Sequence, residues 1–171
     1  FNGEIYNYLE LRGRLAKDFG AMFDTDGDGA ALVVGSHYLG ETIVRELRGM
    51  FAFLIWDSHE RVLFGARDWF GIKPLYTYSD ARGSFFASEK KSLLALASDA
   101  ERADVDTAAA PHYLTLQYVP EPATMHRAIR RVRSGPPFNL RRGDPLRPPP
   151  PVHPHLPNRP APRRGNPSAP A

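Results

Sequence analysis

Three consecutive residues near the start of the sequence, Asn2, Gly3 and Glu4, carry groups that could do chemistry. An asparagine side chain beside a glycine N–H supplies the donors of an oxyanion hole, which stabilises the negative oxygen of a tetrahedral intermediate. A second interpretation is structural: Asn2 caps a helix, and Glu4 lies in the acidic first turn. The tripeptide alone leaves both interpretations open.

The segment from Asp24 to Gly29 resembles the first half of a calcium-binding EF-hand loop, with acids at positions 1, 3 and 5 and glycine at position 6. Position 12 of such a loop carries a bidentate glutamate, but that residue is Gly35 here. We therefore predict no metal site. Asp28 is instead expected to cap the helix that follows it.

Two further motifs favour structural roles. The stretch Arg67 to Tyr76 lacks the glycine spacing of a phosphate-binding loop, so it predicts a turn between strands in which Arg67 and Asp68 are satisfied locally. Ser88 is placed to cap a helix over 89–96. The six histidines show no metal-ligand spacing and no Ser-His-Asp arrangement.

Hydrophobic spacing predicts helices that alternate with antiparallel strands. The expected helices span residues 4–19, 29–39, 42–47, 89–96 and 106–117. The expected strands span residues 50–56, 61–66, 75–78 and 84–87 and form two hairpins. Consecutive strands between groups of helices indicate an α+β fold with antiparallel sheets.

Composition excludes several classes of protein. The chain has no cysteine, which excludes disulfide scaffolds, Cys-ligated zinc and a cysteine nucleophile within these residues. No apolar run is long enough to span a bilayer, and we expect a cytoplasmic protein without membrane contact. The net charge of +3 combines a mildly acidic part up to residue 126 with a basic part beyond it. The acidic part does not suggest a nucleic-acid surface.

The last residues differ in composition from the rest of the chain. Of the 17 prolines, 13 lie beyond Gly135, and few aliphatic residues remain to be buried. We predict that residues 136–171 form a disordered Pro/Arg-rich tail. Its composition is also typical of a GC-rich coding sequence read in the wrong frame, so a frameshift near Gly135 is one hypothesis and a real tail the other.

The motifs, taken in order, resemble those of the class II glutamine amidotransferases, and within them the glutamine-hydrolysing asparagine synthases. They are Phe1 to Asn7, Gly49 to Phe53, Arg67 to Tyr76 and Phe86 to Lys91. Tyr118 to Thr124 resembles the segment that leaves the glutaminase domain. The resemblance indicates a partial glutaminase domain at 1–117, a connection at 118–135 and the tail at 136–171.

The resemblance implies a four-layer α/β/β/α sandwich of the N-terminal nucleophile hydrolase type. In that family an N-terminal cysteine hydrolyses glutamine to glutamate and ammonia. A synthetase domain then uses ATP and magnesium to amidate aspartate, and the intact proteins can be homo-oligomers. By this resemblance Asn2 and Gly3 form the oxyanion hole, while Glu4 and Asp28 bind the α-amino group of glutamine. Asp28 lies in Gly27-Asp28-Gly29-Ala30, which departs from the family's Ser-Asp-x-Glu stretch on both sides.

The nucleophile, the arginine that binds the glutamine carboxylate and the synthetase domain would all lie outside this sequence. We therefore expect a piece of a longer enzyme, truncated at both ends, with no cofactor of its own and no glutaminase activity alone. Three alternatives stay open: a non-catalytic remnant that binds glutamine weakly, the glutaminase domain of a related amidotransferase with a different acceptor, and a nucleic-acid binder that uses the basic tail.

Overall fold

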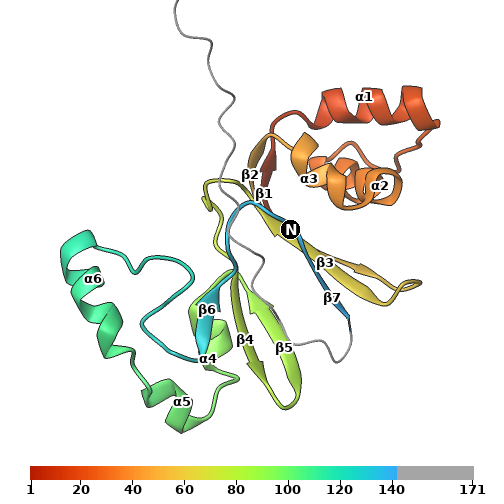
Figure 1. The fold of residues 1–171 in the computed structure, drawn as a ribbon. Coiled ribbons are helices and arrows are strands. Elements are labelled where there is room, and N and C mark those ends of the chain that lie inside the picture. Colours follow the sequence, from red (N-terminus) through yellow and green to blue (C-terminus); the bar gives the residue numbers. More distant parts are fainter. Residues whose placement is uncertain (142–171) are drawn as a thin grey trace, which may run out of the picture.

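The computed structural model describes residues 1–141, whose helices and strands alternate along the chain (Figure 1). The strands are β1 (Asn2–Ile5), β2 (Gly49–Asp57), β3 (Val62–Arg67), β4 (Tyr76–Asp80), β5 (Gly83–Ala87), β6 (Ile129–Arg131) and β7 (Phe138–Arg141). The α-helices are α1 (Tyr8–Phe19), α2 (Asp28–Leu39), α3 (Ile43–Glu46), α4 (Lys90–Leu94), α5 (Asp99–Ala103) and α6 (Ala110–Leu116). Two 3-10 helices, η1 (Gly40–Thr42) and η2 (Thr107–Ala109), precede α3 and α6.

The strands form two antiparallel sheets. The first has the order β1-β2-β3-β7, and the second has the order β5-β4-β6. Hairpins join β2 to β3 and β4 to β5. The predicted α+β class with antiparallel sheets is therefore confirmed.

One face of the first sheet packs against α1, α2 and α3. Its core includes Phe51 and Phe53 of β2, with Leu15 and Leu32 from the helices. Phe51 and Phe53 are 1% and 2% exposed, because successive odd residues of β2 point to this face. Figure 1 shows the three helices together on one side of β1, β2 and β3.

The other face of the first sheet meets the second sheet. Ala52 and Leu54 of β2 contribute to this second cluster, as do Phe86 of β5 and Phe138 of β7. The rings of Phe86 and Phe138 stack at 5.7 Å between centroids. A third cluster, around Tyr78 and Ile129, packs the second sheet against α4.

The predicted helix over 4–19 is wrong at its start. Residues 2–5 form β1, and the helix begins only at Tyr8. Asn2 therefore does not cap a helix. The turn before α1 is held by Asn7, whose side chain donates to Glu46 O at 2.9 Å and accepts from Arg48 N at 2.8 Å. These bonds fix the turn to the start of β2, so β1 can pair with β2 before the helix begins.

The prediction of disorder from residue 136 is wrong for its first residues. Phe138–Arg141 form β7, which pairs antiparallel with β3 and buries Phe138 at 8% exposure. The segment 118–135, expected as a connection, contributes β6 to the second sheet. The predicted tail beyond residue 141 and the frameshift hypothesis lie outside the described residues.

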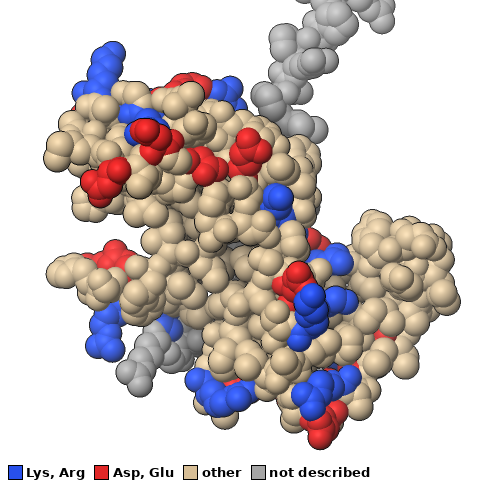
Figure 2. Space-filling model, turned by 180° about the vertical axis from the view of Figure 1, so that it is seen from behind, with Lys and Arg blue, Asp and Glu red and all other residues tan. Residues whose placement is uncertain are grey.

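Acidic and basic side chains are interspersed on the face of the molecule that Figure 2 shows. Among residues 1–141, no helix has both the length and the hydropathy that crossing a membrane requires.

Candidate functional site

The backbone N–H of Gly3 lies on the outer edge of β1. Within residues 1–141, β1 pairs only with β2, and Gly3 faces Phe51. Phe51 uses both of its backbone groups on the other side: its N–H donates to Asp68 Oδ2 at 3.3 Å, and its C=O accepts from Asp68 N at 2.8 Å. Because Gly3 and Phe51 are thus a non-hydrogen-bonded pair, the Gly3 N–H points away from β2. It is available to a ligand on the open edge.

Position 3 requires glycine. Gly3 has φ +145°, and a Cβ built there would lie 2.1 Å from the carbonyl oxygen of Met50. Backbones approach most closely at non-hydrogen-bonded pairs, so no side chain fits without separating the strands. The same residue thus permits the strand pairing and presents the outward N–H.

Asp28 lies on the same open edge. It is the first residue of α2, and its Oδ2 accepts from the backbone N–H of Ile5 at 3.0 Å. Ile5 faces Gly49 and has the same parity as Gly3, so its N–H also points outward. Asp28 Oδ1 has no hydrogen-bond partner within residues 1–141. One oxygen therefore fixes the carboxylate to β1, and the other can receive a cation.

The side chains of Asn2 and Glu4 share the face of β1 opposite the buried Ile5, since alternate residues of a strand point the same way. Asn2 Nδ2 donates to Ser88 Oγ at 3.3 Å, at the end of β5. Its second amide hydrogen is left for another acceptor. Glu4 is exposed and has no partner in the described part of the chain.

The structure brings the four predicted site residues to one strand edge. The outward N–H groups of Gly3 and Ile5, the second of which holds the Asp28 carboxylate, are two residues apart on β1, a distance of about 7 Å. The side chains of Asn2 and Glu4 leave the same strand on the face turned towards Ser88. The edge therefore offers an N–H donor at Gly3 and a carboxylate acceptor at Asp28.

The turn after β3 bonds to β2, the strand that pairs with β1 on the side away from the open edge. Asp68, 1% exposed, accepts from the N–H groups of Phe70, Ile72 and Lys73 at 3.0 to 3.1 Å, in addition to Phe51. Its local satisfaction was predicted from the sequence and is confirmed. Arg67 reaches further than predicted, to Glu121 Oε1 at 2.7 Å.

Comparison with known proteins decides the family. Residues 1–146 match the family described as "Glutamine amidotransferase domain". The chain belongs to this family. The match extends beyond Gly135, where we expected the resemblance to end, and it includes β7.

Relatives of this amidotransferase domain are longer proteins. A Mycobacterium tuberculosis (strain ATCC 25618 / H37Rv) protein, provisionally named asparagine synthetase [glutamine-hydrolyzing], is 55% identical over 139 residues, which are 79% of this chain and 21% of the relative. Asparagine synthetase [glutamine-hydrolyzing] 1 of Bacillus subtilis (strain 168) is 45% identical over 141 residues, 82% of this chain and 22% of the relative. Amidase chry2 of Gibberella zeae is 36% identical over 100 residues, 58% of this chain and 15% of the relative. The chain thus spans about a fifth of the first two relatives.

Sequence reasoning missed two residues whose contacts reach the candidate site or the loop that leads to it. Ser88 was predicted to cap a helix, but the helix cap is Glu89, and the Ser88 hydroxyl accepts from Asn2, 86 positions away. Arg12 was taken only as part of a helix, yet its guanidinium bonds the loop before Asp28. Neither contact leaves a signal in the local sequence, because both depend on how distant elements pack.

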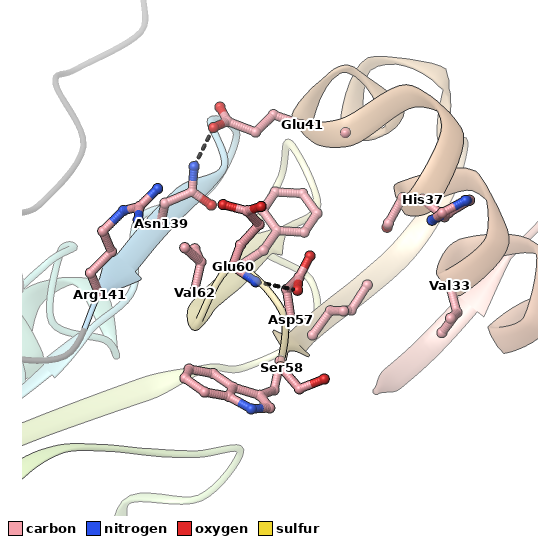
Figure 3. A pocket seen from close by; sticks show the side chains of 14 residues that line it. Val33, His37, Glu41, Asp57, Ser58, Glu60, Val62, Asn139 and Arg141 are labelled. Atoms are coloured by element: carbon pink, nitrogen blue, oxygen red, sulfur yellow. Dashed lines mark hydrogen bonds between the residues drawn. The ribbon is translucent and has the colours of Figure 1, made fainter.

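A pocket of about 510 Å³ lies elsewhere on the domain, between α2, the β2–β3 hairpin and β7 (Figure 3). Its walls include Val33, Trp56, Asp57 and Arg141, and none of the four predicted site residues. Within residues 1–141 no group of three His, Asp or Glu side chains is placed to hold a metal ion. The pocket and the candidate strand edge are therefore separate features of the domain.

Proposed function

We propose that the open edge of β1 binds glutamine for hydrolysis of its side-chain amide. The observation that carries this proposal is the placement of Gly3 N–H and the Asp28 carboxylate on one edge, with Asp28 anchored to Ile5 at 3.0 Å. The amide carbon of glutamine lies four bonds from its α-nitrogen, about 5 Å apart when extended. If glutamine lies alongside β1 and its hydrogen bonds run sideways to the strand, that length is comparable with the separation of about 7 Å between the outward N–H groups of Gly3 and Ile5, the second of which holds Asp28.

Each residue has a role in this proposal. Gly3 N–H and Asn2 Nδ2 donate to the amide oxygen and hold it more strongly once it becomes an oxyanion, because hydrogen bonds to charged acceptors are stronger. Loss of one such donor costs an acyl-transfer enzyme about 3 kcal/mol of transition-state stabilisation. Asp28 Oδ1 and Glu4 accept from the α-ammonium group.

The nucleophile must come from outside residues 1–171, because the chain contains no cysteine. A thiolate would attack the amide carbon, and the resulting oxyanion would lie against Gly3 and Asn2. Cleavage of the C–N bond with proton transfer to nitrogen releases ammonia, and water then hydrolyses the thioester to glutamate. The chain alone supplies binding and oxyanion stabilisation without a reaction to accelerate.

We further propose that the parent protein is a cytoplasmic asparagine synthase with a four-layer fold of the N-terminal nucleophile type. In that function ammonia reaches a synthetase domain, which amidates aspartate with ATP and magnesium. The support is the two relatives named asparagine synthetase and the helices that pack on the outer faces of both sheets. A different acceptor is the second candidate, favoured by the relative named amidase.

A chimera tests the proposed site. Residues 1–141 would replace the corresponding segment of the Bacillus subtilis relative, which is 45% identical and would supply the cysteine. We expect the chimera to release glutamate from glutamine and the 171-residue chain alone to release none above background. Turnover by the chain alone would contradict the assignment of an external nucleophile. A folded but inactive chimera would contradict the assignment of the site.

A further inference from the structure

We propose that Arg12 is a positioning residue, which holds the loop of residues 22–27 so that Asp28 faces the edge of β1. The significance of this role rests on the proposed function, in which Asp28 receives the α-ammonium group of glutamine. Arg12 itself does not touch the site. It acts through the loop that leads into α2.

Three contacts join Arg12 to this loop. Its Nη1 donates to the carbonyl oxygen of Thr25 at 2.5 Å, and its Nη2 lies 3.2 Å from Asp26 Oδ1. The guanidinium carbon also stacks over the ring of Phe23, 4.3 Å from its centroid. The Arg12 side chain is only 16% exposed, although its partner Asp26 is fully exposed. A mostly buried guanidinium with two hydrogen bonds to one loop restricts the conformation of that loop.

Apart from Phe23, which packs against the first hydrophobic core, the loop has few other contacts to fix it. Within residues 1–141, the backbone of residues 22–26 makes no hydrogen bond to other backbone groups, and both of the loop's side-chain hydrogen bonds come from Arg12. Met22 is 88% exposed and adds no packing. A loop of this kind has many accessible conformations. A planar guanidinium that bonds two consecutive residues therefore removes much of the loop's conformational entropy.

Arg12 also connects the two halves of the strand-edge site. It lies on α1, which follows β1 after two residues, and the loop that it holds ends at Gly27, the residue before α2. Asp28 then bonds back to Ile5 of β1 at 3.0 Å. Arg12 on α1 thus holds the loop before Asp28, and Asp28 in turn bonds to the strand that precedes α1. Release of the loop should therefore loosen the Asp28–Ile5 hydrogen bond first.

Amide exchange of the 171-residue chain, followed by NMR, tests this role. Arg12→Met keeps the apolar stem and removes the guanidinium, whereas Arg12→Lys keeps the positive charge. Asp28→Ala removes the carboxylate and gives the exchange rate of the Ile5 amide without its acceptor. Arg14→Met is the matched control, since Arg14 lies on the same helix and pairs at 2.9 Å with Glu46, away from the loop. We expect the Ile5 amide to exchange roughly tenfold faster in Arg12→Met, as in Asp28→Ala, with partial rescue in Arg12→Lys.

The comparison of amides separates positioning from general stability. A purely structural role would accelerate the amides of β2 and β3 in the same proportion as Ile5, whereas positioning accelerates Ile5 and the start of α2 alone. Unchanged Ile5 exchange in both Arg12 variants, or equal acceleration in Arg14→Met, would overturn the inference. If Arg12→Met does not fold, the same comparison of exchange at Ile5 with exchange in β2 and β3 is made in Arg12→Lys. Glutamine is not used, so this result is independent of the glutaminase test.

Discussion

Asp28 Oδ2 accepts a hydrogen bond from the backbone N–H of Ile5 at 3.0 Å, across 23 residues of sequence. The contact fills the place that a neighbouring strand's carbonyl would take on the outer edge of β1. It fixes the direction of the carboxylate while leaving Oδ1 without a partner in the described residues. In the proposed site the same side chain therefore holds the strand edge with one oxygen and binds the ligand with the other.

Asp28→Asn in the chimera should raise the KM for glutamine by about tenfold and lower kcat much less. An asparagine oxygen can still accept from Ile5, so the edge is kept, but the charge that would pair with the α-ammonium group is lost. The matched substrate is the glutamine analogue that lacks the α-amino group, for which the variant and the parent should have equal kinetics. An equal rise in KM with both substrates would show that Asp28 does not bind the α-ammonium group.

Gly3→Ala should destabilise the chain by about 2 kcal/mol or more, because φ is +145° and the new Cβ would meet Met50 O at 2.1 Å. Gly13→Ala is the control. Gly13 lies within α1 with nothing within 4 Å of a built Cβ, so alanine there should stabilise by about 0.5–1 kcal/mol. Urea unfolding followed by circular dichroism measures both, and opposite signs are the expected result.

Asp68→Asn should cost about 2–3 kcal/mol, since an amide cannot accept from all four N–H groups that the buried carboxylate satisfies. Asp18→Asn serves as the comparison, because Asp18 is exposed in the last turns of α1 and its side chain makes no hydrogen bond or ion pair within residues 1–141. Its substitution should be close to neutral. Denaturant midpoints that shift equally in the two variants would refute the role given to Asp68.

Much of the fold could be predicted from residue patterns. The short, continuous apolar run from Met50 to Trp56 is a strong strand signal, and the α2 helix follows from an apolar run between Asp28 and Gly40. β1 was missed because Ile5, Tyr8 and Leu11 also fit a helical spacing, and nothing local shows that Asn7 ends one element and begins the next. β7 was missed because its pairing with β3 is more than 70 residues away and its composition is close to that of the tail.

The candidate site was predicted only in part. Asn2, Gly3 and Glu4 stood out by residue type, and Asp28 by resemblance. The outward direction of the Gly3 N–H follows from the bonds between Phe51 and Asp68, and these depend on strand register. Register is a property of the folded sheet rather than of any local motif.

The Asp80 carboxyl gives a pH-dependent prediction. Hydrogen bonds from Arg82 lower its pKa from 3.8 to about 2. Because the pKa is lower in the folded state, the contribution of this carboxylate to stability is complete above about pH 4 and is lost as the pH falls towards 2. Arg82→Met should therefore flatten the fall in melting temperature between pH 4 and pH 2. Identical slopes for the variant and the unaltered chain would show that Arg82 does not stabilise the charged carboxyl.

The most direct measurement is the glutaminase rate of the chimera with Asn2→Ala, compared with the unaltered chimera and with Asn139→Ala, a control on β7 beside the separate pocket. If Asn2 Nδ2 donates to the oxyanion, Asn2→Ala should lower kcat by about 100-fold with little change in KM, and Asn139→Ala should leave both unchanged. An Asn2→Ala chimera that releases glutamate as fast as the unaltered chimera would contradict the assignment of the β1 edge as the site of amide hydrolysis.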